Sequence, residues 1–558
     1  MTIKTFLWGM ITFTFLAAGS QQAAADPEVL RDDIQIRKLV DTRQLTMRIA
    51  KDPRDNVLYT LTASGTISRI VIKSEEDAIA SFEEEVATSS DHGFRDTQGF
   101  DIGPDGTFYI GAITRQGGRV NNIAKGVLDP ATGERTWTTI ARAEPIPSGT
   151  KNHPHPAIVL SPDGRFVYLN SGSRTDHGEA DGSGIREVPL ASAILRVPTD
   201  GQDIVIPADE EALKASGYLF ADGFRNAFDM AFAGNGDMFA ADNGPDSDLP
   251  DGIMWVRQGR HFGFPWRMGG IDNAMRSPDY DPATDNYILF TSSGAKSDGL
   301  FHNDPDYPPP PMEFSDPVIN IGPDADRLRD PETGEVLDAS DLGLVVHTLT
   351  PHSSPLGIVF DVENALAPEF RGDGFVLRTG GDCCNLINSF NDPDEDLLHL
   401  DLEKVGDNYQ ARVTRLIGGF RGPIDAEMIG NKIYVIEWSG SRGLWEVTLP
   451  AREQTAIEES GGEALPTDFA LAQNYPNPFN PSTAIAYQVG TAAHVELTIY
   501  NLAGQKIRTL VDSRLDAARY AARWDGRDQA GANVASGVYL YRMRAGSFEE
   551  IRRLTLIR

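Results

Sequence analysis

The feature that most constrains the fold is a pattern that recurs through residues 30–450. Each copy is a short apolar run, then a turn rich in Asp, Asn, Gly or Pro, then a second apolar run. Short apolar runs separated by such turns are typical of paired β-strands. A single pair of strands cannot bury itself, so several copies in one chain predict small sheets packed against one another. The six copies begin near residues 47, 99, 158, 229, 357 and 424.

Six such sheets predict an all-β fold, a six-bladed β-propeller over residues 30–450. The spacing is widest between the fourth and fifth copies, where residues 304–311 read DPDYPPPP. Proline cannot donate to a β-ladder, so we expect a long loop there that covers one face. Pairing of residues 443–449 with a strand near residues 34–40 is expected to close the ring. A two-sheet sandwich is the alternative, although one sandwich rarely takes this many residues.

The N-terminus has the pattern of a secretory signal peptide over residues 1–25. Lys4 precedes an apolar run, and three alanines at residues 23–25 form a small-residue cleavage site. The run is too short for a comfortable membrane span, and no later segment predicts a transmembrane helix. We therefore expect an exported protein. The two cysteines, Cys383 and Cys384, are adjacent, and both a vicinal disulfide and a pair of reduced thiols stay open.

Charge narrows the choice of partners. The chain has 81 acidic and 50 basic residues, a formal net charge of −31. Such a balance argues against nucleic acid and anionic membranes as partners. Acidic loops such as residues 246–248 are compatible both with bound calcium and with a solvated surface.

The C-terminal part differs in composition from the acidic body. Residues 451–465 are polar and rich in Gly and Glu, as in a linker. Residues 466–558 are mildly basic and contain alternating strand patterns at residues 484–489, 495–500 and 538–543. These features predict a small immunoglobulin-like β-sandwich.

Ordered motifs in this tail resemble a known domain. They are FALAQNYPNPFNPST at residues 469–483, IYNLAG at 499–504, WDGRD at 524–528 and ASGVY at 535–539. The tail resembles the C-terminal sorting domain of the type IX secretion system, of the FlgD-like immunoglobulin type. The resemblance implies export through the periplasm and the type IX secretion machinery to the cell surface or the medium. A purely adhesive module is the alternative.

Within the body, residues 221–266 concentrate groups suited to ligand binding. Arg225 and Asn226 precede a probable strand pair, and Gly244 and Pro245 follow it in an acidic loop. Loops at strand ends are where binding groups collect. An arginine, an amide and an oxygen-rich turn together suit an anionic ligand held through a metal ion.

Five ordered motifs carry a further resemblance over most of residues 40–448. They are NHP at residues 152–154, GFRN at 223–226, DNGP at 242–245, HFGFPW at 261–266 and PHSSPLG at 351–357. The body resembles the soluble PQQ-dependent glucose and sorbosone dehydrogenases. The resemblance implies PQQ and Ca²⁺ as cofactors and oxidation of a sugar or polyol hydroxyl to a carbonyl or lactone. Because the chain has no haem-attachment motif, the electrons would leave to a separate carrier.

The resemblance also implies roles for particular residues. His153 would be the general base, a task that suits a histidine because its pKa lies near working pH; His155 is a weaker candidate. Arg225 would be a catalytic residue and would also contact carboxylates or a quinone oxygen of the cofactor. The other implied residues are Asn226, Asn243, Arg378 and Arg421 for the cofactor, and the carbonyls of Gly244 and Pro245 for calcium. Each has a plainer explanation: a loop cap for His153, an ion pair between blades for Arg225, a simple turn for Gly244 and Pro245.

Some positions depart from the glucose dehydrogenase pattern. Where that subgroup has an aspartate to orient the histidine, this chain has residues 171–173 (SGS). A hydroxyl stabilises imidazolium less than a carboxylate does, so His153 is expected to be a weaker base or to be oriented by Asp176. The loop at residues 246–252 lacks an acidic Asp-Glu pair, which leaves a second calcium in doubt. Two other functions stay open, a calcium-dependent lactonase-type hydrolase and a non-catalytic propeller that binds glycan or protein.

Overall fold

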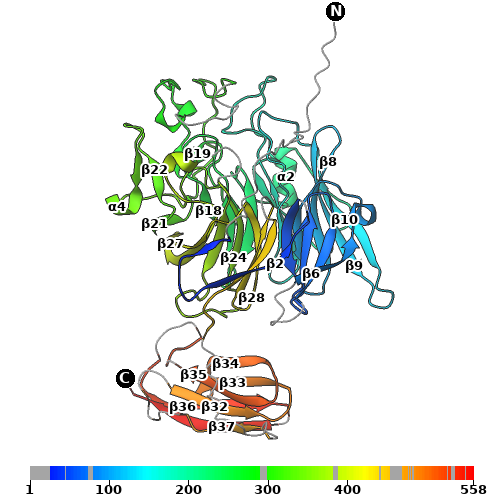
Figure 1. Cartoon of the computed structure of the whole chain (residues 1–558), viewed down its shortest axis with the longest axis vertical. Helices are drawn as coiled ribbons and strands as arrows, with labels where there is room; N and C mark the ends of the chain where they lie inside the picture. Colours follow the sequence, from blue (N-terminus) through cyan, green and yellow to red (C-terminus); the bar gives the residue numbers. More distant parts are fainter. Residues whose placement is uncertain are drawn as a thin grey trace, which may run out of the picture. The chain divides into compact units, whose positions relative to one another are not determined.

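The computed structural model describes residues 26–43, 45–72, 80–288, 298–380, 387–438, 442–452, 468–474, 477, 479, 483–524, 526–529, 534–546 and 548–557. The chain forms two compact units, residues 1–450 and residues 451–558 (Figure 1). The expected signal peptide, Cys383, Cys384 and most of the expected linker lie outside the described residues.

The first unit is built from small sheets that follow one another along the chain. Short apolar runs form the strands, and turns with Gly, Asp and Asn connect them, as at the left-handed Gly106 and Gly164. In its described part, six sheets each start from an innermost strand. From inside outward, the first sheet has β3 (Thr46–Lys51), β4 (Leu58–Thr62), β5 (Ile67–Ile72) and β6 (Ala80–Ala87), and the second has β7 (Thr97–Ile102), β8 (Phe108–Arg115), β9 (Arg119–Leu128), β10 (Arg135–Ala143) and β14 (Ile204–Ile206). The third has β11 (Ile158–Leu160), β12 (Phe166–Ser171), β13 (Ala193–Pro198) and β15 (Leu219–Asp222), and the fourth has β16 (Ala227–Phe232), β17 (Met238–Asp242) and β18 (Gly252–Val256). The fifth has β24 (Pro355–Phe360), β25 (Gly374–Arg378), β26 (Asp396–Val405) and β27 (Asn408–Gly418), with β1 (Glu28–Val29) and β21 (Ile319–Pro323) paired to β27, and the sixth has β28 (Pro423–Ile429), β29 (Lys432–Glu437), β30 (Gly443–Thr448) and β2 (Gln35–Asp41).

The innermost strands enclose a common axis. Each contacts the innermost strand of the next sheet, in the cycle β3, β7, β11, β16, β24, β28 and back to β3. This closed cycle is a propeller and not a two-sheet sandwich. The N-terminal strand β2 pairs antiparallel with β30, Gln35 lying opposite Thr448 and Asp41 opposite Gly443, as the sequence predicted. The pairing joins the start of the propeller to its end.

Carboxylates on alternate innermost strands bind the next sheet. Each accepts a backbone N–H from the neighbouring innermost strand, so a polar side chain in the channel replaces a missing ladder bond. The pairs are Asp101 with Leu160 (2.7 Å), Asp229 with Ile358 (3.0 Å) and Asp425 with Ile49 (2.8 Å). The buried guanidinium of Arg48 lies 3.3 Å from both Asp229 and Asp425 and offsets part of this negative charge.

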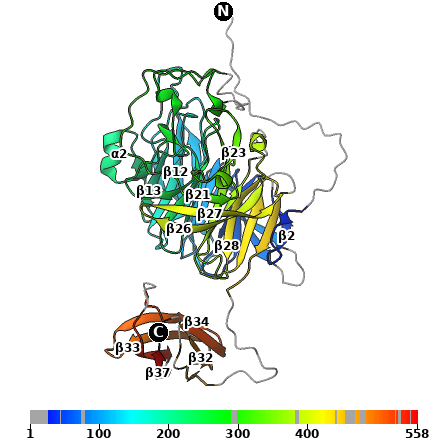
Figure 2. The ribbon, with the colours of Figure 1, turned by 90° about the vertical axis from the view of Figure 1, so that its left-hand side faces the viewer.

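One end of the channel collects the loops that bear the candidate site. The sheets repeat around the axis, so the residues before each innermost strand and the residues after each second strand lie at the same end. The segment between β18 and β24 gathers over this end, at the top of Figures 1 and 2. Its proline-rich stretch at residues 304–311 forms no strand, as expected. The remaining elements are α1 (Ser89–His92), α2 (Glu210–Ser216), β19 (Arg267–Met268), β20 (Ile271–Asp272), η1 (Ala274–Arg276), η2 (Asn286–Ile288), β22 (Arg327–Arg329), β23 (Val336–Asp338), α4 (Ala339–Leu342) and η3 (Ile387–Phe390).

The second unit is a sandwich of two sheets, as predicted. One sheet has β31 (Ala470–Leu471), β32 (Thr483–Val489) and β35 (Ala518–Trp524); the other has β34 (Lys506–Leu515), β33 (Ala493–Asn501), β36 (Gly537–Ala545) and β37 (Phe548–Leu556). Alternate residues of these strands point inward, and the buried core includes Trp524, Leu497 and Tyr541. The predicted fold class, a propeller followed by an immunoglobulin-like sandwich, is thus confirmed. Among the described residues, the structure contains no helix that is long and apolar enough to cross a membrane.

Candidate functional site

His153 lies in the segment that precedes β11, at the end of the channel described above. Its side chain is buried, and its Nδ1 lies 2.8 Å from Oγ of Ser173. The Ser173 hydroxyl donates its one proton to the carbonyl of Thr175 at 2.8 Å. The hydroxyl must therefore accept from an Nδ1–H of His153. This arrangement leaves the lone pair on Nε2, the form that a general base requires.

The electrostatic surroundings keep His153 neutral. Burial, and next the positive charge of Arg225, lower the pKa of His153 well below its usual value. Of the two orienting partners that the sequence suggested, the structure places Ser173 against the ring. The Asp176 carboxylate instead binds Arg225. His153 is thus a neutral imidazole held by a hydroxyl, without a hydrogen-bonded countercharge.

A buried arginine that the sequence analysis did not single out supports this pair. Arg119, at the start of β9, donates to the carbonyl of His153 at 2.9 Å and to the carbonyl of Gly172. Within the described part of the chain it has no carboxylate partner, and burial lowers its pKa to about 10. One guanidinium therefore holds both backbone segments that carry His153 and Ser173. No local pattern signals this role, because its partners are 34 and 53 residues away.

Arg225 lies between loops of two sheets. Its Nη2 is 2.6 Å from Oδ1 of Asp176, and its Nε donates to the Asp176 carbonyl at 2.9 Å. Its Nη1 reaches the Asn243 carbonyl at 3.4 Å, and Oδ1 of Asp246 is 3.6 Å from Nη2. Burial opposes its charge, but Asp176 and Asp246 raise the pKa of Arg225. Arg225 thus forms the ion pair of the plainer expectation, and it lies beside Asn243.

The two candidate asparagines lie beside Arg225. Asn226 donates from Nδ2 to Oδ1 of Asn243 at 3.0 Å, and Asn243 donates to the Pro355 carbonyl at 2.8 Å. Oδ1 of Asn226 is buried and accepts no hydrogen bond from the described residues. An unpaired buried acceptor is costly, so this atom is free to take a donor from a ligand. Asp242 receives the backbone N–H of Asn226 at 2.7 Å, and burial raises the pKa of Asp242 to about 7.

The turn at Gly244 and Pro245 offers two backbone oxygens. Its conformation is fixed by Asp251, which accepts the Gly244 N–H and, through its other oxygen, the Ser354 N–H at 3.0 Å. Among the described residues, nothing donates a hydrogen bond to the carbonyl of Gly244 or Pro245. Hard cations such as Ca²⁺ take backbone carbonyl oxygens at such turns. The donor set therefore fits calcium, with further ligands to come from water or a bound group.

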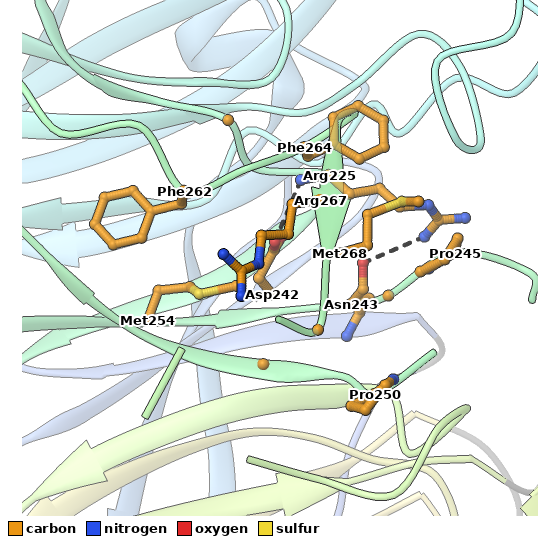
Figure 3. Close-up of a pocket in the computed structure, with 14 residues that line it drawn as sticks. Arg225, Asp242, Asn243, Pro245, Pro250, Met254, Phe262, Phe264, Arg267 and Met268 are labelled. Carbon is orange, nitrogen blue, oxygen red and sulfur yellow. Dashed lines mark hydrogen bonds between the residues drawn. The ribbon is translucent and has the colours of Figure 1, made fainter. Parts of the chain in front are cut away.

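A small cavity of about 10 Å³ adjoins this turn. Figure 3 shows the guanidinium of Arg225 directed toward the turn, with Phe264 and Met268 from the following segment beside it. This volume is about what one water-sized sphere occupies. An organic cofactor would have to lie at the channel mouth instead.

Two aspartates of the acidic loop after Pro245 already form ion pairs within the protein. Asp246 forms an ion pair with Lys151, and Asp248 pairs with Arg329 and with Nε2 of His352 at 2.8 Å. In the described part of the chain, no three or more His, Cys, Asp and Glu side chains are grouped to hold a metal. The loop therefore gives no support to a second calcium or to a side-chain metal centre of the lactonase type.

Three other candidates make no contact with Arg225, Asn226 or the Gly244–Pro245 turn among the described residues, although Arg378 and Arg421 flank strands at the same end of the channel. Arg378 is fully buried and pairs with Asp392 at 2.7 Å and Asp396 at 2.6 Å, so its guanidinium is used inside the fold. Arg421 has an exposed side chain, and its backbone N–H donates to Glu437. His155 is bonded through Nδ1 to Gln98, and burial lowers its pKa to about 4. We leave Arg378, Arg421 and His155 out of the proposed site.

Comparison with known proteins identifies part of the chain. Residues 480–547 match the family model of the FlgD Ig-like domain. The C-terminal unit contains an FlgD Ig-like domain. This confirms the immunoglobulin-like part of the prediction for the tail. No curated protein matches the chain.

Solved structures similar to the chain include sugar dehydrogenases. The soluble aldose sugar dehydrogenase of Escherichia coli in the apo-form is 15% identical, with 74% of this chain and 99% of that chain covered and a TM-score of 0.48. The PQQ-bound aldose sugar dehydrogenase of Streptomyces coelicolor is 17% identical, with 76% and 99% covered and a TM-score of 0.44. The holo PQQ domain of pyranose dehydrogenase from Coprinopsis cinerea is 12% identical, with 76% and 97% covered and a TM-score of 0.47. At this level of similarity, the activity must be argued from the residues of this chain.

Proposed function

We propose that the protein is a PQQ- and calcium-dependent dehydrogenase that oxidises a sugar or polyol hydroxyl to a carbonyl or lactone. The observation that carries the proposal is the form of His153. Ser173 holds its ring so that Nε2 is an acceptor, and Arg225 is the charged group that most affects the pKa of His153, lowering it. The ordered motifs around these residues add independent support.

Each residue of the site has a separate role in the proposed reaction. His153 accepts the hydroxyl proton of the substrate at Nε2, and Ser173 and Arg119 keep the ring and its backbone in place. Arg225 presents a fixed positive charge that stabilises negative charge on a substrate or cofactor oxygen. Asn226 offers its free amide oxygen to a donor. The carbonyls of Gly244 and Pro245 would hold Ca²⁺. When bound, PQQ supplies the hydride acceptor, and Ca²⁺ polarises it.

Reconstitution tests this function. Full-length protein would be titrated with PQQ with and without Ca²⁺, followed by dye-linked oxidation of a panel of aldoses and polyols. We expect a calcium-dependent change in quinone absorbance and turnover of at least one sugar. His153→Gln is expected to keep the cofactor and lose turnover. Absence of both cofactor binding and oxidation would refute the proposal, and hydrolysis of lactones without PQQ would favour the hydrolase.

The proposal extends to location and partners. We propose that residues 1–25 and 466–558 direct export through the periplasm and the type IX secretion machinery, and that a separate carrier takes the electrons. The FlgD Ig-like match supports the domain type of the tail. A reporter placed between residues 1–25 and residues 466–558, expressed in a bacterium with this machinery, is expected to reach the surface or medium. Retention of the fusion in the periplasm would contradict this address.

A further inference from the structure

A segment outside the proposed chemistry closes over the loop that carries Asp176. Residues 298–307, called the strap here, lie between η2 and β21. Asp304 of the strap is 2.7 Å from the guanidinium of Arg186, and Tyr307 donates its hydroxyl to the backbone carbonyl of His177 at 3.1 Å. Phe301 is buried in the same contact. The strap is thus fixed to the loop at several points, and His177 lies at their centre.

His177 is enclosed by hydrogen-bond acceptors. Its Nδ1 lies 2.9 Å from Oδ2 of Asp176 and 3.5 Å from Oε2 of Glu179, and its Nε2 lies 3.2 Å from the carbonyl of Leu300. Its ring stacks on Phe301 with centroids 4.1 Å apart and an interplanar angle of 7°. A carbonyl can only accept, so Nε2 must carry a proton, and an ionised carboxylate likewise requires a proton on Nδ1. The geometry therefore describes an imidazolium.

The charges around the ring agree with this form. Burial disfavours the imidazolium, but Asp176 and Glu179 raise the pKa of His177 above its usual value. The strap presents a carbonyl and an apolar ring to the imidazole, and the negative charge of Asp304 is directed to Arg186. Other charged or titratable groups of the described residues on this loop are Arg174, Asp181 and Glu187, and those packed around it include Arg225, Asp246, Lys151 and Tyr307.

One carboxylate joins His177 to the proposed site. Oδ2 of Asp176 binds His177, while Oδ1 and the main-chain carbonyl bind Arg225 at 2.6 and 2.9 Å. Burial alone would raise the pKa of Asp176, but Arg225 and His177 hold it below its usual range. Asp176 therefore stays ionised between two cations. Any movement of His177 alters the carboxylate that orients Arg225.

We propose that His177 is a positioning residue that couples the strap to Arg225, so that closure of the strap fixes the orientation of this guanidinium through Asp176. The inference rests on the function proposed above, in which Arg225 contacts the cofactor or substrate. It adds that the loop at residues 171–190 and the strap form one unit with the site. Opening of the strap removes the Leu300 carbonyl and the Phe301 ring that hold His177, so the carboxylate of Asp176 loses a fixed partner and orients Arg225 less firmly.

His177→Gln tests the coupling, and His302→Gln is the matched control. His302 also lies on the strap and also contacts the Leu300 carbonyl, at 2.9 Å, but its side chain is exposed. The first readout needs no cofactor: phenylglyoxal modification of Arg225, followed by peptide mass mapping and normalised to the exposed Arg421 in the same sample. The second readout is the affinity for PQQ in the presence of Ca²⁺.

We expect His177→Gln to raise the relative modification of Arg225 and to weaken PQQ binding, each by about tenfold, the size of one lost hydrogen bond to a charged group. His302→Gln is expected to match the wild type. As the pH rises from neutral to alkaline, the wild-type protein should gain Arg225 reactivity in a step that His177→Gln lacks. A variant that is folded by circular dichroism and keeps wild-type reactivity at Arg225 would overturn the proposal. Absence of the alkaline step in the wild type would also overturn the proposal, and this result does not depend on whether the variant folds. A wild type that binds no PQQ would refute the proposed function alone, because Arg225 modification still tests the coupling.

Discussion

Ser173→Ala is the sharpest test of how His153 is held. The Ser173 side chain is fully buried and makes two hydrogen bonds of 2.8 Å, accepting from His153 and donating to the Thr175 carbonyl. The substitution leaves a buried ring N–H and a buried carbonyl without partners. Each such group costs about 1–3 kcal/mol, so we expect a loss of about 2–6 kcal/mol in the free energy of unfolding. The removed volume is one hydroxyl, so the cavity adds little.

The assay pairs stability with the protonation pattern of the ring. Urea denaturation gives the change in unfolding free energy from the shift of the midpoint. Nitrogen chemical shifts of ¹⁵N-histidine-labelled protein, assigned with His153→Gln, report which ring nitrogen of His153 carries the proton. In the wild type we expect the proton on Nδ1. In Ser173→Ala we expect a mixture of the two neutral forms, because nothing then selects one.

Ser171→Ala separates the two effects. Ser171 is equally buried and also makes two hydrogen bonds, accepting from Asn121 at 2.7 Å and donating to the Leu190 carbonyl. It does not hydrogen-bond to His153. We expect a similar loss of stability and an unchanged ring. If Ser173→Ala costs less than about 0.5 kcal/mol, well under the price of one unpaired group, and leaves the proton on Nδ1, the assignment of Ser173 as the orienting group is wrong.

Three further predictions concern the framework. Burial raises the pKa of Asp101 to about 7, so its contribution to stability is present below about pH 4 and is lost as the pH rises to about 7. The resulting fall of unfolding free energy with rising pH is worth up to about 4 kcal/mol at 1.36 kcal/mol per pH unit. Asp101→Asn should abolish this fall, as measured by urea denaturation at several pH values, and an unchanged pH dependence would contradict the prediction. Arg48→Met removes the cation between two buried aspartates, and we expect the urea midpoint to fall by an amount equivalent to about 3–5 kcal/mol, whereas a loss below 1 kcal/mol would show that these carboxylates are not ionised together. Trp524→Ala empties the core of the FlgD Ig-like unit and should cost that unit about 3–5 kcal/mol by calorimetry, with little effect from the matched exposed Trp438→Ala.

The propeller fold could be predicted from the sequence because each sheet repeats the same local pattern of strands and turns. Apolar runs and glycine-containing turns specify strand pairs within a few residues, and a ring needs only that the last sheet meet the first strand. Pairing of β2 with β30 was predictable for this reason. The long segment between β18 and β24 was not, because its course depends on contacts with other loops. Its proline run predicted a long loop that covers one face, but not the contacts of that loop.

The candidate site likewise contains some residues that the local sequence predicts and others that it does not. Arg225, Asn226 and Gly244 come together because each flanks a strand of one sheet, a position that the motifs reveal. Arg378 also ends a strand, but its orientation depends on Asp392 in the loop before β26 and on Asp396 at the start of β26, which no motif predicts. Such pairings are settled by tertiary packing and leave no periodic signal in the sequence.

His177 and Arg119 show what the motifs miss. The Leu300 carbonyl lies 123 residues from His177, and the carbonyls that Arg119 holds are 34 and 53 residues away. Both residues act on the site through other groups, and neither belongs to a motif. Only the three-dimensional arrangement identifies them as supports of Arg225 and His153.

The electrostatics of His153 bear on the departure from an aspartate partner. A carboxylate at the position of Ser173 would stabilise the imidazolium, whereas a hydroxyl adds no charge. Burial and the cation of Arg225 both act against the protonated ring. A negative group that pairs with Arg225 would remove part of this penalty, because the field of Arg225 at the ring would be compensated. The strength of the base is therefore coupled to what Arg225 binds, and an anionic cofactor at the channel mouth would make His153 a better proton acceptor at the moment that the substrate requires one.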